Sequence, residues 1–257
     1  MAIHAEIDVS RLLERERTAR EICAELNDFV ELGPVLDTVL KRIRAIAGCE
    51  AVAIRLHAGG DFPYYTWDGL TETFAAHENS LCRTLTSSDA IKNCMCARII
   101  QGTIDETLPL FTPGGSFWCN DTSAMLAKYP DNGRESAPLY YCNASGYESV
   151  ALIPIKTRTQ TIGLLQLNDS SKGAFAQDLI EYLEMLAMQI GLAIRNAALY
   201  TKLKQALDEA KVLHGLLPIC ASCKRIRDDE GYWHQLEAYM SDHSDVLFSH
   251  GLCPVCI

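Results

Sequence analysis

The sequence predicts an α+β fold in which an antiparallel sheet is flanked by helices. The first observation is the segment 149–169, where two strand-like runs surround a polar turn and predict a hairpin. The second is a proline-free segment from Gln177 to Leu213, which predicts one unusually long helix. The third is a pair of helix-like segments before residue 48. A sheet with helices before and after it follows from these patterns.

The elements follow one another along the chain in a clear order. Apolar residues at helical spacing predict a helix over residues 5–31, which Gly33-Pro34 ends, and a second helix over 35–48. Residues 50–57 and 62–67 are predicted strands, separated by the turn residues 59–61. Residues 68–148 are expected to be irregular. In the long helix a coiled-coil-like seam is predicted, formed by Leu183, Leu186, Ile190, Ala193, Ala197, Tyr200, Leu203, Leu207 and Ala210.

Composition limits the class of protein. The chain has 257 residues and a formal net charge of −10, which disfavours nucleic acid as a partner. No apolar run is long enough to cross a membrane, and the charged N-terminus has no apolar signal-peptide core, so a cytoplasmic location is expected. Eleven cysteines in a reducing compartment favour metal, cluster or redox chemistry over disulfides.

The hairpin with its "IGLLQLND" stretch and the following "FAQDLIEYLEMLAMQIGLAIRNA" resemble a GAF domain over about residues 20–200. The resemblance implies an antiparallel sheet of five or six strands, a ligand pocket on one face, a sensory role and dimerisation through flanking helices. We therefore expect an N-terminal helix (1–33), a GAF sensor (34–178), a long signalling helix (179–216) and a cysteine module (217–257).

Two GAF subfamilies fit this sequence poorly. Members that bind cyclic nucleotides carry an Asn-Lys pair followed by a phenylalanine and an acidic pair. Here Asn168 precedes Asp169, and Phe175 leads to Leu179-Ile180. The cysteine-histidine pair that attaches bilins is missing as well, because no cysteine is followed by histidine.

The end of the chain holds two C-x-x-C pairs, Cys220/Cys223 and Cys253/Cys256, with 29 residues between them. Zn²⁺ accepts four thiolates tetrahedrally, and a module of about forty residues rarely has core enough to hold itself, so a structural zinc is predicted. An iron centre and redox-active thiols are the alternatives, and His250 is a substitute ligand. The stretches "LPICASCKRIRDDEGYW" and "FSHGLCPVC" resemble a cysteine module at the ends of bacterial signalling proteins with PAS or GAF domains.

Four further cysteines, Cys82, Cys94, Cys96 and Cys142, lie in the variable middle, where a GAF pocket is usually built. A soft all-thiolate site would suit Zn²⁺ or an iron–sulfur cluster. Thiol redox chemistry and simple packing remain open for these four. Packing is expected for Cys23 and Cys49, and packing is also favoured for Cys119.

One enzyme class is a specific alternative. A GAF-fold reductase of free methionine sulfoxide has its nucleophilic cysteine just before the strand that Cys142 precedes here. Cys94 would be the resolving partner: the Cys142 thiolate attacks the sulfoxide, and a disulfide with Cys94 then forms, with methionine and water as the products. The residues at Cys94, "CMCA", differ from the Gly-Val-Cys-Gly pattern of the reductase.

No phosphate loop, catalytic triad or kinase motif is present in the sequence. We therefore predict a sensory signal-transduction protein that forms a homodimer and signals through a downstream protein partner. The alternative is the reductase that uses Cys142.

Overall fold

The fold comes from a computed structural model. It describes residues 2–27, 31–81, 95–103, 110–128, 139–157, 160–214, 218–228, 230–243, 248–249, 251–252 and 254. The chain divides into two compact units, residues 1–198 and 199–257, which are described one at a time.

The first unit is built around a five-stranded antiparallel sheet in the order β2-β1-β5-β4-β3. The strands are β1 (Ala51–Leu56), β2 (Tyr64–Asp68), β3 (Phe117–Cys119), β4 (Ser149–Lys156) and β5 (Thr161–Asp169). The β4–β5 pair is the predicted hairpin, and its register places Val150 beside Asn168 and Leu152 beside Gln166. The predicted α+β class, with a five-stranded antiparallel sheet and flanking helices, is confirmed.

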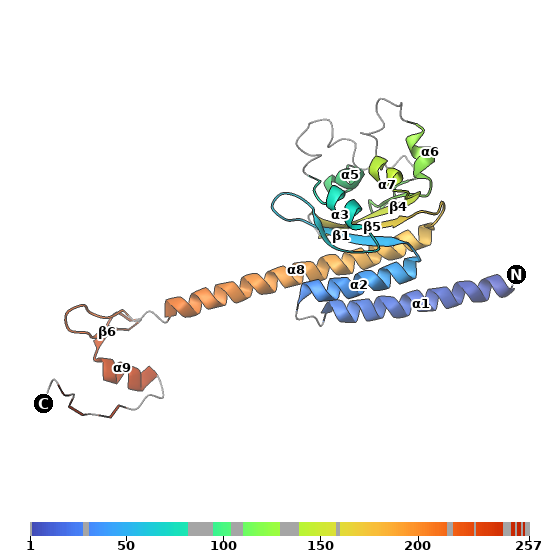
Figure 1. The fold of residues 1–257 in the computed structure, drawn as a ribbon. Coiled ribbons are helices and arrows are strands. Elements are labelled where there is room, and N and C mark those ends of the chain that lie inside the picture. Colours follow the sequence, from blue (N-terminus) through green and yellow to red (C-terminus); the bar gives the residue numbers. More distant parts are fainter. Residues whose placement is uncertain are drawn as a thin grey trace. The chain divides into compact units, whose positions relative to one another are not determined.

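Helices α2 (Leu32–Ala47) and the first part of α8 (Gln177–His214) cover one face of the sheet, which we call the helix face (Figure 1). Helix α1 (Ala2–Asn27) packs against α2 on the side away from the sheet. The core between the helices and the sheet takes Val52 and Ile54 from β1 and Leu165 and Leu167 from β5. Since side chains alternate along a strand, the intervening residues face the other way.

One predicted helix boundary needs correction. Helix α2 begins at Leu32, so Gly33-Pro34 lies inside its first turn and does not follow the end of the preceding helix directly. Proline is tolerated there because the first amides of a helix have no partner within the helix. The predicted end at Gly48 is confirmed: Gly48 has φ +63°, and its amide donates to the Arg44 carbonyl oxygen.

The opposite face of the sheet, which we call the distal face, carries short helices within the region expected to be irregular. They are α3 (Glu72–Glu78), α5 (Met95–Gln101), α6 (Thr122–Leu126) and α7 (Tyr140–Ala144), with five to seven residues each. Helices this short have no room for a repeated hydrophobic period, so the sequence did not reveal them.

The predicted long helix is confirmed as α8, but the first four residues of its predicted seam are used differently. Leu183, Leu186 and Ile190 are fully buried against the sheet within the same chain, and Ala193 is nearly so. The later seam residues Tyr200, Leu203 and Leu207 are exposed, and outside the predicted seam Met185, Met188, Leu192 and Leu199 are exposed as well. The repeat of apolar residues along a helix predicts an apolar stripe, but it does not reveal whether that stripe packs against the sheet or against a second helix.

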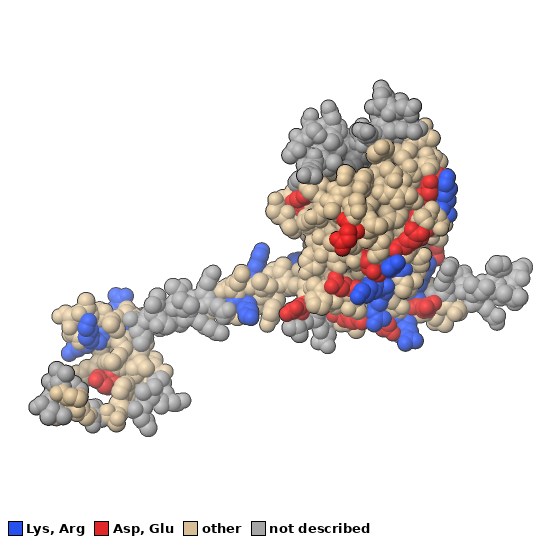
Figure 2. Space-filling view, viewed as in Figure 1, with Lys and Arg blue, Asp and Glu red and all other residues tan. Residues whose placement is uncertain are grey.

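Charged residues of both signs are mixed over α1 and α2 on the face seen in Figure 2. There Arg42 donates to Glu21 and to Glu25, each at 2.7 Å. Within the described residues, no helix combines the length and apolarity that a membrane crossing requires.

The second unit continues with the end of α8 and a small cysteine-bearing module. A short hairpin, β6 (Ile226–Arg227) and β7 (Trp233–His234), precedes α9 (Leu236–His243). A bridge between Ile219 and Ile226 adds a third segment beside the hairpin.

Candidate functional site

Side chains from the distal face of the sheet and from the short helices form a second buried cluster, which we call the distal layer. It is mostly apolar, with Phe74 from α3, Met95, Cys96 and Ile99 from α5, and Cys142 from α7. The sheet contributes Ala51, Ala53, Tyr64, Phe117, Val150, Leu152 and Leu164.

Three polar side chains cross this apolar layer as a hydrogen-bonded ladder. The Tyr64 hydroxyl donates to Gln166 Oε1 at 3.1 Å, and Gln166 Nε2 donates to Asn168 Oδ1 at 2.9 Å. Gln166 and Asn168 are two residues apart on β5, so they share the distal face. Both are buried, and Asn168 Nδ2 has no hydrogen-bond partner among the described residues.

Arg55 lies on the same face of β1 and is fully buried. Its guanidinium carbon is 3.6 Å from the centre of the Tyr64 ring, close enough for a cation–π interaction. The guanidinium also donates to the carbonyl oxygens of Phe62 (3.1 Å) and Glu78 (2.6 Å). A positive charge is thereby fixed beside the ladder.

Burial raises the pKa of Tyr64 well above its ordinary value. The Arg55 charge opposes this shift in the tyrosine pKa, whereas Cys96 and Cys142 add to it. The Tyr64 hydroxyl therefore stays protonated and acts as a donor, and both cysteines lie close enough to interact with it.

The structure brings together two of the four predicted sensor cysteines. Cys96 on α5 and Cys142 on α7 are both buried in the distal layer. Cys82 and Cys94 lie outside the described residues. Within the described part of the chain, no group of three or more His, Cys, Asp or Glu is arranged for a metal ion. A four-thiolate site in the sensor therefore stays a prediction.

Cys49 and Cys119 are buried, as packing predicts. Burial raises the pKa of the Cys49 thiol to about 12, and Asp169 adds to this shift. The pKa of Cys119 is raised as well, mainly by burial. Both thiols therefore remain neutral, and a neutral thiol is a poor nucleophile and a poor metal ligand.

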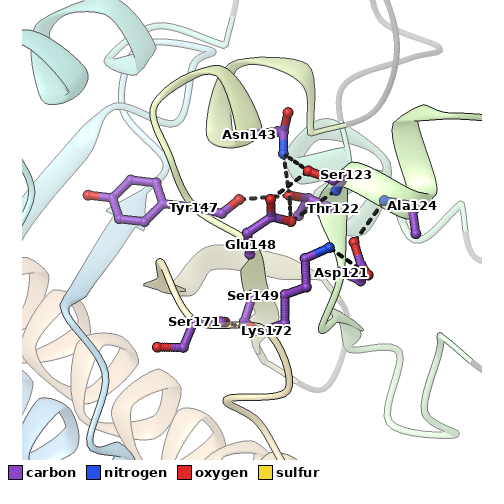
Figure 3. A network of polar contacts seen from close by, with 10 residues as sticks. All are labelled: Asp121, Thr122, Ser123, Ala124, Asn143, Tyr147, Glu148, Ser149, Ser171 and Lys172. Atoms are coloured by element: carbon purple, nitrogen blue, oxygen red, sulfur yellow. Dashed lines mark hydrogen bonds and ion pairs between the residues drawn. The ribbon is translucent and has the colours of Figure 1, made fainter.

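A polar network fastens α6 and α7 to the start of β4 (Figure 3). Glu148 accepts from the Ser123 amide at 3.1 Å and from the Ser123 hydroxyl at 2.5 Å. Asn143 Nδ2 donates to the hydroxyls of Thr122 and Ser123, each at 2.9 Å. The bonds from Ser123 lower the pKa of Glu148. This network positions the helix that carries Cys142.

A turn at residues 112–116 lies between the distal layer and α8. Before the turn, Phe111 packs against Phe117 of the distal layer, with ring centres 5.4 Å apart. On the other side, the Thr112 hydroxyl donates to the Glu184 carboxylate on α8. Lys156, at the end of β4, donates to the Gly114 carbonyl oxygen at 2.6 Å. A Cβ at Gly114 would collide with the Glu184 carboxylate, so a larger residue there would displace the end of that side chain.

In the terminal module, Cys220 and Cys223 form a tight turn. The Cys223 amide donates to Cys220 Sγ at 3.5 Å, and the Lys224 amide donates to the Cys220 carbonyl oxygen at 3.0 Å. Lys224 has φ +60°, so the chain reverses in the left-handed region just after the second cysteine. The amide of Cys223, followed by that of Ser222, lowers the pKa of Cys220. These amides favour the thiolate, the form that binds metal.

The other predicted tail ligands, Cys253 and Cys256, lie outside the described residues, as does His250. The described part of the module is poorly buried. Ile226 is its one buried residue among those described, whereas Tyr232, Trp233 and Leu252 are exposed.

Sequence reasoning missed Arg55 and did not predict a role in the site for Gln166, and it considered Asn168 only as part of a subfamily motif. A signal for two of them was present. In "LLQLND", polar residues alternate with leucines inside a strand that must be buried on both faces, which implies a polar group within the core.

The GAF domain family matches residues 31–194. Because this match covers well over half of the chain, the chain belongs to the GAF domain family. A comparison with curated proteins gave no significant match.

Solved GAF structures resemble the fold. The GAF domain of a phosphoenolpyruvate-protein phosphotransferase from Coxiella burnetii is 14% identical, with TM-score 0.52, over 74% of this chain and 98% of that one. The phycocyanobilin-bound GAF domain of a cyanobacterial phytochrome is 17% identical, with TM-score 0.52, over 72% and 96%. Free methionine-R-sulfoxide reductase from Neisseria meningitidis, in complex with its substrate, is 14% identical, with TM-score 0.50, over 71% and 91%. At these identities the likeness shows the fold alone.

The ladder generates a test of stability. Tyr64→Phe removes the hydroxyl and leaves the buried Gln166 Oε1 without its donor, so we expect a loss of about 1–3 kcal/mol in the free energy of unfolding. Urea denaturation followed by circular dichroism measures it. Tyr65→Phe is the matched control, since Tyr65 is the neighbouring residue on β2 and is 44% exposed. Equal effects of the two substitutions would contradict the role of the ladder.

Proposed function

We propose that this protein is a sensor whose distal layer responds to a small ligand or to redox state and that signals as a homodimer. The observation that carries the proposal is the buried ladder from Tyr64 to Asn168, which lies beside Cys96, Cys142 and the Arg55 charge in a mostly apolar layer. Buried polar groups with convergent geometry are typical of small-molecule sites. The phytochrome domain and the reductase hold a bilin and a substrate, respectively, on the same fold.

The turn at residues 112–116 supplies a route from the distal layer to α8. Its Phe111 side contacts the layer, and its Thr112 bonds to Glu184. Met185 and Met188, one and four residues further along α8, are exposed. A ligand that moves the turn would therefore alter the helix next to its exposed apolar stripe. A switch requires two packings of that stripe with different affinity for the ligand.

The exposed stripe of α8 favours a second copy of this chain as its cover. Met185, Met188, Leu192, Leu199, Leu203 and Leu207 are each between 40% and 59% exposed, and they recur at steps of three, four and seven residues. Val9, Leu12 and Leu13 on α1 are exposed as well. Two such helices would bury their stripes against each other, as in coiled coils. The output then passes to a downstream signalling protein.

The terminal module is proposed to hold one Zn²⁺ through Cys220, Cys223, Cys253 and Cys256. The described half fits this ion, because the Cys220–Cys223 turn brings two sulfurs together and its amides favour thiolate. The zinc would fix the fold of the module.

In the sensor, Cys82, Cys94, Cys96 and Cys142 would hold Zn²⁺ or an iron–sulfur cluster if redox state is the signal. Cytoplasmic location is part of the proposal, since thiols persist there.

The reductase is the second candidate function. What favours it is that Cys142 and Cys96 both interact with Tyr64 in the distal layer, on a fold that the reductase from Neisseria meningitidis shares. The sensor proposal expects no NADPH consumption through thioredoxin and its reductase when free methionine sulfoxide is added. Turnover that disappears in Cys142→Ser, and persists in Cys23→Ser, would establish the reductase instead.

The dimer can be tested at the stripe. Leu203→Glu places a carboxylate in the apolar interface, so the dissociation constant of the dimer should rise at least about 100-fold. Light scattering after gel filtration, across a dilution series, measures it. Gln205→Glu adds the same charge half a turn away, where α8 is also exposed, and should leave the dimer intact. A monomeric wild type at every concentration would contradict the proposal.

The zinc is tested by stoichiometry. We expect Cys220→Ser to lose about one zinc per chain relative to the wild type, measured by mass spectrometry of the metal in reduced, desalted protein. Cys23→Ser, on α1, should retain the wild-type amount. Module susceptibility to limited proteolysis should rise in Cys220→Ser, because the staple is lost. Equal zinc in the two variants would overturn the assignment.

A further inference from the structure

We propose that the distal layer binds an acyl compound, a small molecule with a carboxylate or amide oxygen on a short apolar body, and that Asn168 Nδ2 donates to that oxygen. The inference deepens the proposed function, since it names the ligand class of the same site. Its basis is the direction of the ladder and the chemistry of the groups around its end.

The ladder has a fixed direction. Because burial raises the pKa of Tyr64, its hydroxyl is protonated and donates to Gln166 Oε1. The amide of Gln166 then points its Nε2 at Asn168 Oδ1. The donor end of Asn168 is left over, fully buried and without a hydrogen-bond partner among the described residues. Buried donors are nearly always satisfied, and an orphaned donor destabilises the fold, so an acceptor oxygen is the expected complement.

The register neighbours of Asn168 on β1 and β4 are apolar, so neither offers its Nδ2 an acceptor from a side chain. In the register of β5, Asn168 lies between Ala51 of β1 and Val150 of β4, and Gln166 lies beside Ala53. Ala51 and Ala53 on β1 have short side chains, so β1 projects little beside Gln166 and Asn168. Both the alanines and Val150 belong to the apolar cluster, so the rest of the ligand meets hydrocarbon.

The charge in the layer favours an acceptor over a cation. Arg55 is fully buried on the same face and stacks on the Tyr64 ring. Its positive charge is felt at the Tyr64 hydroxyl, where it opposes the rise in pKa. A carboxylate or a carbonyl dipole is stabilised by this charge, whereas an ammonium group is repelled.

Three probes with the same carbon chain separate these chemistries: butanoate, butanamide and 1-butylamine. We expect butanoate and butanamide to bind the full-length wild type at least about tenfold more tightly than 1-butylamine, measured by saturation-transfer NMR with titration. Wild-type affinity for butanamide should not vary between pH 6 and pH 9. A wild type that binds none of the three, or binds the amine best, would overturn the proposal.

Asn168→Asp isolates the donor. It keeps the oxygen that accepts from Gln166 and replaces Nδ2 with a carboxyl oxygen, which donates only while protonated. Its affinity for butanamide should fall at least about tenfold as pH rises through the pKa of the new carboxyl. Asn27→Asp, at the exposed end of α1, should behave as the wild type. Wild-type affinity of Asn168→Asp at pH 9 would refute the role of Nδ2.

A second measurement does not depend on the folding of a variant. In wild-type protein labelled with ¹⁵N, the side-chain amide resonance of Asn168 should shift with butanamide and stay in place with 1-butylamine.

Native mass spectrometry of the purified protein separates this inference from the proposed function. A co-purifying molecule without an acyl oxygen would overturn the inference and leave the ligand sensor standing. A molecule with such an oxygen would support both.

Discussion

The structure depends on one constraint, which is that the central strands of the sheet are covered on both faces. Strand β5 lies between β1 and β4, with the α1, α2 and α8 core on one side and the distal layer on the other. Any polar side chain on β5 must therefore find its partners inside the protein. Gln166 meets this demand by bonding to Tyr64 and to Asn168, whereas Asn168 meets it with its oxygen alone, because its Nδ2 has no hydrogen-bond partner among the described residues. The ladder is the consequence of placing two amides in a strand that has no exposed face.

The same constraint explains which parts of the fold the sequence could predict. The β4–β5 hairpin and α8 were predictable because strand-like runs around a turn, and a long segment without proline, are local patterns. Local sequence does not reveal which part of the structure packs against each apolar residue of α8. Leu186 and Leu203 look alike in the sequence, yet the first packs under the sheet and the second is exposed. The burial of Arg55 was equally hidden, because its bonds go to main-chain oxygens that no residue type encodes.

The two faces of the sheet are linked by contacts at the end of β4. Lys156 reaches the Gly114 carbonyl oxygen with its side chain, and its own carbonyl oxygen lies where a Cβ on Gly191 of α8 would be 2.6 Å away. The helix backbone therefore lies directly on the strand end, and Glu184, about two helical turns earlier on α8, accepts from the Thr112 hydroxyl. Close packing of this kind transmits small displacements, because neighbouring atoms have no free volume to absorb them. The residues that hold α8 to the sheet are thus also in contact with the turn that borders the distal layer.

The terminal module is under a different constraint, since its described residues bury almost nothing. Among its described residues Ile226 is the buried one, and α9 has no buried residue. Full burial of one isoleucine contributes about 1.5–3 kcal/mol, whereas ordering each residue costs about 1.5 kcal/mol. A unit of this size cannot close that deficit through its own apolar side chains. The Cys220–Cys223 turn, with its amides directed at a sulfur, is the part of the module built for a stronger bond. On the zinc proposal, coordination of the metal would supply free energy on the scale required, and the thiolates would then determine whether the module folds.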